Sequence, residues 1–99
     1  MFKWDININA VMMERGISIT AARVLFEVNR LVKAAAAEGQ RDSSGIAYCD
    51  VGWNALGQRI GKSRRTIDRA IAELKAAGLV KVERTRDNAR IYILEGVEG

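Results

Sequence analysis

Two glycines divide the C-terminal half of this chain into short amphipathic segments, and their spacing limits the possible folds more than any other feature. The apolar positions that share a helical face are Trp53, Leu56 and Ile60 in the first segment, and Ile67, Ala70, Ile71 and Leu74 in the second. Gly61 and Gly78 follow these segments where a glycine commonly ends a helix. Ser63 is suited to cap the second helix. Gly61, Lys62 and the cap Ser63 connect the segments, so the sequence predicts helices over 53–60 and 63–77 that are joined by a tight turn.

A longer helix is predicted over residues 20–37, ahead of this pair. Its apolar residues recur three and four positions apart: Val24, Leu25, Val28, Leu31, Val32 and Ala35. Thr20 is a reasonable cap for its start, and Gly39 is placed to end it. The charged residues fall mainly on the other side, and Glu27 stands three positions before Arg30. We therefore interpret these charges as a solvated face with pairing along the helix.

Segments typical of β-strands flank the helix pair. After the polar loop 40–45, residues 46–51 predict a short first strand. Beyond Gly78, residues 79–84 and 91–94 predict the two strands of a hairpin, joined by a polar turn at 85–88.

The N-terminal residues 1–17 are harder to interpret because they alternate like a half-buried strand. The apolar members of this alternation are Phe2, Trp4, Ile6 and Ile8. One interpretation is an arm that packs on its own domain, and the other is a contact between two copies, made together with the long helix in a homodimer. With 99 residues, the chain has room for one domain, with a core over 18–94 and a tail at 95–99.

The positive charge is concentrated in the second half of the chain. Residues 1–50 carry six Lys/Arg and six Asp/Glu, whereas residues 59–90 carry ten and four. Such a concentration favours a polyanion such as nucleic acid. No run of about 18 apolar residues predicts a membrane span, and the N-terminus does not resemble a signal peptide. We therefore expect a cytoplasmic protein without membrane contact.

The composition offers little for catalysis. The chain has no histidine and one cysteine, Cys49, so we expect no enzyme activity, no metal site and no cofactor. Cys49 is expected to be a small buried residue of the first strand. The alternative, a redox-sensing thiol, has little support because Tyr48 and Asp50 would not lower a thiol pKa.

The order of these elements is that of a winged helix-turn-helix. The stretch Leu56–Arg84, LGQRIGKSRRTIDRAIAELKAAGLVKVER, resembles this family in its short helix, glycine, second helix, and glycine that leads into a wing. The resemblance implies an α+β fold with a three-helix core, a C-terminal β-hairpin wing, and an N-terminal arm outside the shared pattern. It also implies that the helix 63–77 reads the major groove of double-stranded DNA.

The candidate DNA contacts are polar and basic residues of this region. They are Arg59, Lys62, Ser63, Arg64, Arg65, Thr66 and Arg69 in the helix pair, and Arg84, Arg86, Asn88 and Arg90 in the wing. The start of the second helix would meet a phosphate, while Arg65 or Arg69 would pair with guanine. Arg59 and Lys62 would position the DNA backbone. Arg84 and Arg86 would share a face if the first wing strand extends that far.

Two nearby residues have more than one interpretation. Asp68 would either accept a hydrogen bond from cytosine or hold Arg64 or Arg69 through a helical pair. Trp53 is expected in the core, with exposure near the DNA backbone as the alternative.

Other functions also fit this pattern. The alternative for Arg64, Arg65 and Arg69 is a solvated helix face. The alternative function is a winged helix that serves as a protein-protein interaction module, since fold alone does not fix function. We favour DNA binding because arginines occur at both the helix and the wing. Such a domain would act by occupancy, as a transcriptional repressor, a plasmid or phage replication organiser, or a partition adaptor.

Overall fold

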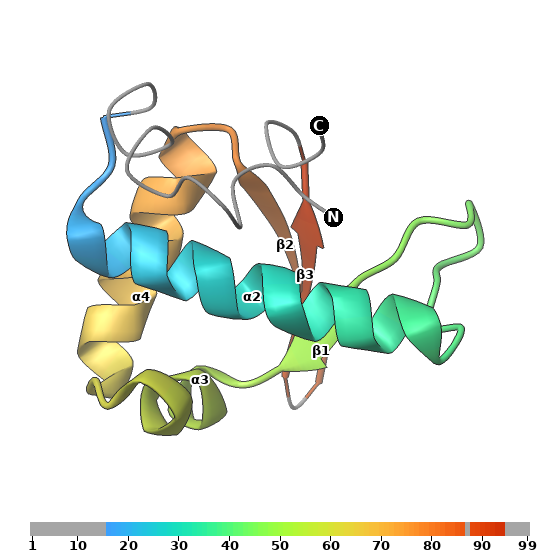
Figure 1. Ribbon diagram of the computed structural model, residues 1–99, viewed down its shortest axis with the longest axis horizontal. Helices are drawn as coiled ribbons and strands as arrows, with labels where there is room; N and C mark the ends of the chain where they lie inside the picture. Colours follow the sequence, from blue (N-terminus) through green and yellow to red (C-terminus); the bar gives the residue numbers. More distant parts are fainter. Residues whose placement is uncertain (1–15, 87, 95–99) are drawn as a thin grey trace.

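The computed structural model describes residues 16–86 and 88–94 of the chain, so most of the predicted arm and the tail lie outside the described residues (Figure 1). The elements in chain order are α2 (Ile19–Ala37), β1 (Cys49–Val51), α3 (Trp53–Ile60), α4 (Arg64–Ala76), β2 (Val80–Arg84) and β3 (Ala89–Ile93). The strands form one antiparallel sheet in the order β1-β3-β2. This is an α+β fold of three helices and a three-stranded sheet, as expected, and it is compatible with a winged helix.

The three helices enclose one core against the sheet. α2 crosses in front of the strands (Figure 1). α4 crosses the N-terminal part of α2 at a steep angle, and α3 lies near the N-terminal end of α4. The largest fully buried apolar side chains come from the three helices, from β3 and from Leu79 just before β2: Val24, Leu25, Val28, Leu56, Ile67, Leu74, Leu79 and Ile91. The helical faces predicted from the apolar spacing are therefore the faces that form the core.

α2 begins earlier than the sequence predicted. Its cap is Ser18 rather than Thr20, and the Ser18 hydroxyl accepts a hydrogen bond from the Ala21 N–H at 3.1 Å. Ser18 also donates from its own hydroxyl to a carboxylate oxygen of Glu73 in α4, at 2.9 Å. This contact across the fold fixes the extended conformation of Ser18, and it cannot be inferred from local spacing.

The turn between α3 and α4 depends on two glycines. Gly61 ends α3 with a φ of +70°, as its place after the apolar face suggested. The Lys62 N–H donates to the Gly57 carbonyl at 2.8 Å, so the chain folds back closely onto α3. A Cβ on Gly57 would overlap the carbonyl oxygen of Lys62. The position of Gly61 after the apolar face predicted its role, whereas the need for Gly57 depends on the close return of the chain at Lys62.

The first strand is shorter than predicted. β1 contains only Cys49–Val51, and Ile46, expected to open the strand, is 53% exposed. The Asp42 carboxylate accepts hydrogen bonds from the N–H groups of Ser44 and Ile46, at 2.9 and 3.0 Å, and thereby forms a tight turn instead. The predicted polar loop therefore extends into the predicted strand.

The hairpin agrees more closely with the prediction, although β3 begins at Ala89, before the expected Ile91. Ala89 pairs with both Arg84 in β2 and Val51 in β1. It thus belongs to a central strand that is bonded on both sides.

Candidate nucleic-acid interface

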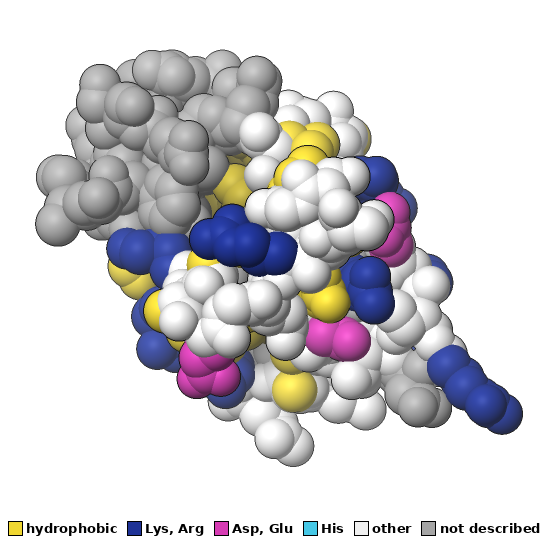
Figure 2. Space-filling model, turned by 90° about the vertical axis from the view of Figure 1, so that its right-hand side faces the viewer, with side chains coloured by type: hydrophobic (Ala, Val, Ile, Leu, Met, Phe, Trp, Pro, Cys, Tyr) yellow, Lys and Arg dark blue, Asp and Glu magenta, His cyan; other side chains and the backbone are white. Residues whose placement is uncertain are grey.

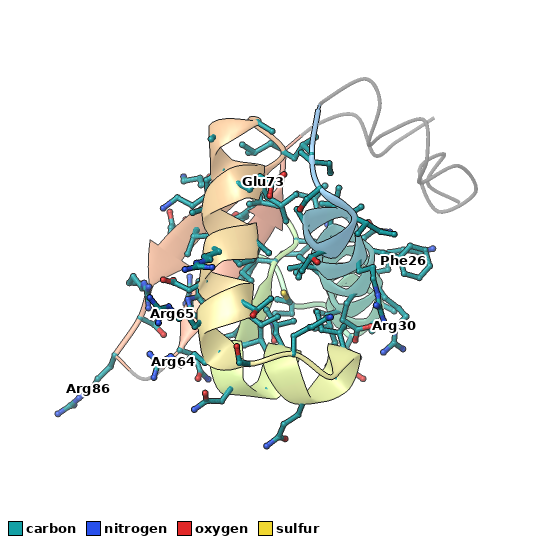
Figure 3. All side chains as sticks on the ribbon, turned by 90° about the vertical axis from the view of Figure 1, so that its left-hand side faces the viewer. Phe26, Arg30, Arg64, Arg65, Glu73 and Arg86 are labelled. Atoms are coloured by element: carbon teal, nitrogen blue, oxygen red, sulfur yellow. The ribbon has the colours of Figure 1, made fainter. Side chains whose placement is uncertain are left out.

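α4 presents a basic surface at its N-terminal half. Its inward residues Ile67, Ile71 and Leu74 are buried, and the predicted outward positions are all exposed: Arg64, Arg65, Asp68, Arg69 and Ala72. Figure 3 shows Arg64 and Arg65 near the first turn of α4, on the side of the wing, with Arg86 at the wing tip. The structure therefore brings the predicted helix arginines and the wing to the same side of the molecule.

The first turn of α4 is suited to a negative charge. Ser63 caps the helix as predicted, because its hydroxyl accepts a hydrogen bond from the Thr66 N–H at 3.2 Å. The Ser63 and Thr66 hydroxyls also lie 3.0 Å apart, within hydrogen-bonding distance. This turn contains no acidic residue, and the N–H groups at the start of a helix lack acceptors within the helix.

A groove separates this helix start from the wing. We call it the wing groove, and its lining residues are Trp53, Arg64, Arg65, Asp68 and Arg84, around a volume of about 430 Å³. A neighbouring hollow of about 400 Å³ shares Trp53 and Arg64 and extends to Asn88. Of the residues predicted to bind DNA, the wing groove collects three arginines from two different elements.

Trp53 forms the floor of the wing groove and is 6% exposed, as expected for a core residue. Its indole N–H donates to Asp68 Oδ1 at 3.2 Å. The Arg84 guanidinium carbon lies 5.2 Å from the centre of the Trp53 ring, in a cation–π contact. Within the part of the chain that the structure describes, Asp68 therefore pairs with this indole and not with the helical arginines that the sequence suggested.

Strand pairing places the two strand-bound wing arginines on opposite faces of the sheet. Arg84 lies directly opposite Ala89, which is buried against the helices, so Arg84 shares that face. Arg90 lies opposite Glu83 and Asp50 on the outer face, with its guanidinium carbon 4.6 Å from the centre of the Tyr48 ring. Arg90 is thus separated from the wing groove.

The remaining wing residues belong to the turn. β2 ends at Arg84, so the condition for Arg84 and Arg86 to share a strand face, a first wing strand that reaches Arg86, is not met. The Thr85 N–H donates to the Asn88 carbonyl at 3.0 Å, and the Asn88 N–H donates to the Thr85 hydroxyl at 3.1 Å. Arg86 projects from this turn away from the body of the protein (Figure 3).

Arg59 and Lys62 differ in their surroundings. Lys62 is exposed in the turn before α4. Arg59 Nη1 lies 3.3 Å from Glu27 Oε2, and Glu27 also pairs with Arg30 at 2.8 Å. The helical pair of Glu27 with Arg30 is confirmed, but the prediction that Glu27 is solvated is wrong, because it is only 9% exposed. Glu27 joins α2 to α3, which reduces the positive charge that Arg59 offers to a ligand.

Another side of the molecule carries mixed charge. Figure 2 shows the side that lies at the right of Figure 1, where Lys and Arg side chains are interspersed with acidic ones. A surface of this kind attracts a polyanion less than the wing groove does, where three arginines accompany one aspartate.

Other chemistry has few candidates among residues 16–86 and 88–94. Within these ranges, no group of three or more acidic or cysteine side chains is arranged to hold a metal, and no helix is long and apolar enough to cross a membrane. Cys49 is buried, as expected, and burial raises the pKa of its thiol to about 12. A thiol with a raised pKa is a poor nucleophile near neutral pH.

Comparisons with known proteins support the fold. No protein-family model matches the sequence, and no curated protein matches it. A solved structure described as "N-Terminal domain of DNA binding protein" superposes with a TM-score of 0.71 at 10% sequence identity. The match covers 84% of this chain and 65% of the other, so the chain spans just under two thirds of that neighbour's length. At this identity the similarity shows the fold alone.

Proposed function

We propose that the protein binds double-stranded DNA, with α4 in the major groove and the wing against the adjacent backbone. The observation that carries this proposal is the convergence of Arg64, Arg65 and Arg84 on the wing groove. Arginine suits both phosphate and the edge of guanine, because its planar fork donates two parallel hydrogen bonds. The described DNA-binding role of the structural neighbour agrees with this function in general terms.

The residues divide by position into two roles. Ser63, Arg64 and Lys62 lie at or before the start of α4, where they suit a phosphate. Arg65 and Arg69 lie four residues apart on the exposed side of the helix, so both would face base edges. Bound in this way, the protein would act by occupying its site, as a repressor or as a replication or partition factor.

Fluorescence anisotropy with a labelled duplex at increasing salt tests DNA binding. We expect the logarithm of the affinity to fall with the logarithm of salt with a slope of several units, about 0.9 for each neutralised phosphate. Arg64→Ala should lower that slope by about one. Arg23→Ala is the matched control, because Arg23 is an exposed arginine of α2, outside the wing groove. A flat salt response would contradict duplex binding and favour a protein-binding module instead.

A further inference from the structure

Trp53 connects the three elements that form the wing groove. Trp53 is the first residue of α3, and its indole N–H donates to Asp68 in α4. The guanidinium of Arg84, the last residue of β2, lies over its ring. Asp68 and Arg84 are far from Trp53 in sequence, so both contacts result from folding. A single buried side chain therefore fixes the separation between the start of α4 and the wing.

We propose that Trp53 is a positioning residue for DNA binding, which holds Arg84 beside Arg64 and Arg65 in readiness for a phosphate. This inference rests on the proposed function. An exposed arginine has many rotamers, and ordering them on binding reduces the affinity. A guanidinium that already lies on an aromatic face has lost part of that freedom before the DNA arrives. A cation–π contact uses the charge of the guanidinium and consumes none of its N–H donors, so a phosphate can still accept hydrogen bonds from them.

Asp68 determines the orientation of the Trp53 ring on which Arg84 lies. Its hydrogen bond of 3.2 Å to the indole nitrogen restricts rotation of the Trp53 ring, and the ring plane in turn determines where Arg84 lies. Asp68 thus acts through Trp53, as an anchor on α4, rather than by contact with a base. This role accounts for an acidic residue among the exposed arginines of α4.

Arg86 provides an internal comparison. It lies beyond β2 in the wing turn and is exposed, and among the described residues it has no aromatic partner. Arg84 and Arg86 therefore carry the same charge on the same hairpin but differ in preorganisation. Only the contribution of Arg84 to affinity should depend on Trp53.

A double-mutant cycle tests this dependence by duplex-binding anisotropy. We expect Arg84→Ala to weaken binding about fivefold in the wild-type background, and less than about twofold in Trp53→Leu, which lacks the aromatic face. Arg86→Ala should have the same effect in both backgrounds. Trp53→Phe keeps a ring but loses the donor, and should give an intermediate coupling. If Trp53→Leu does not fold, as judged by circular dichroism, the cycle with Trp53→Phe decides.

A measurement on the free protein supplements the cycle. The indole N–H resonance of Trp53, assigned by its loss in Trp53→Phe, should shift in Asp68→Ala, and the Arg84 Nε–H should become more mobile. Equal effects of Arg84→Ala in all backgrounds, with salt-dependent binding by the wild type, would overturn the positioning role and leave the proposed function intact. A wild-type protein that does not bind duplex DNA would overturn both.

Discussion

At the scale of single residues, the same side-chain type has different roles according to its neighbours. Arg64 and Arg65 face solvent at the start of α4, Arg84 lies on Trp53, and Arg59 is paired with a buried glutamate. A count of basic residues therefore overstates what is available to a ligand. The arginines best placed for an anionic ligand are those that lack an acidic partner within the described structure and surround the wing groove.

Base recognition should depend on particular arginines of α4. We expect Arg65→Ala or Arg69→Ala to reduce the preference for the target sequence over a substituted site by about tenfold, because a bidentate contact to guanine is lost. Lys62→Ala should instead weaken binding to all duplexes alike, as expected for a phosphate contact. Competition binding with matched and substituted duplexes distinguishes these effects. Uniform losses from all three substitutions would show that these arginines do not read bases.

The thiol of Cys49 should be inert in the folded protein. Because burial raises its pKa to about 12 from an ordinary value of 9.0, almost no thiolate is present at pH 8. A thiol reagent should react slowly at pH 8 and rapidly in denaturant.

The same burial should make stability depend on pH. Above pH 9 the unfolded chain loses the Cys49 proton and the folded chain keeps it, so the free energy of unfolding should fall between about pH 9 and 12 by up to about 1.4 kcal/mol per pH unit. Cys49→Ala should lack that component, and rapid labelling of the native protein would contradict the burial.

At the scale of elements, the connection between α3 and α4 is tightly constrained. It holds the helix start that faces the wing groove, and it contains the close approach of Gly57 to Lys62. A small movement of this turn would displace Ser63 and Arg64 together, because both follow directly after it.

Gly57→Ala tests this constraint. Alanine normally favours a helix over glycine by about 1 kcal/mol, but here its Cβ would overlap the Lys62 carbonyl oxygen. We therefore expect a net destabilisation of about 1–3 kcal/mol in urea unfolding, the usual cost of overpacking. Gln58→Ala, at an exposed position of the same helix, is the control and should be nearly neutral. A stabilised Gly57→Ala would mean that the turn relaxes at little cost.

The sequence predicted the elements whose ends depend on nearby residues. Gly61 ends α3 and Ser63 caps α4, so the limits 53–60 were predicted correctly, those of α4 to within one residue at each end, and the inward faces of both helices are the predicted ones. The errors arise where distant partners decide the outcome. Ser18 caps α2 while bound to Glu73, Glu27 is buried against α3, and Asp68 pairs with Trp53. These contacts join residues that are far apart in the sequence or on different elements, so the spacing of apolar residues within one helix does not predict them.

At the scale of the whole molecule, the groove is produced by folding and not by any one segment. α4 and β2 contribute arginines, α3 contributes the floor, and β3 holds the wing by pairing with both other strands. One face of a small domain therefore carries the features expected of an interface. Most of the N-terminal segment, interpreted as an arm, lies outside the described residues.

We predict that the full chain forms a homodimer through that segment and α2. The apolar alternation at Phe2, Trp4, Ile6 and Ile8 motivates this prediction, as does the limited core of a 99-residue chain. Sedimentation equilibrium at tens of micromolar should report twice the monomer mass, and Trp4→Asp should shift the population to monomer. Duplexes selected from a random pool should then show a two-fold symmetric motif. A monomeric wild type at that concentration would reject the dimer.

The bond between Ser18 and Glu73 has a practical consequence. Glu73 lies nine residues beyond Arg64 along α4, which corresponds to about 13 Å of helix, and it is seen near the opposite end of α4 in Figure 3. The polypeptide thus enters the body of the protein at the end of α4 that is remote from the wing groove. A fluorophore or a surface tether attached through a cysteine introduced at Ile19, which is 66% exposed beside Ser18, would lie at that remote end. Such a label offers a way to immobilise the molecule while its arginines still face the solution.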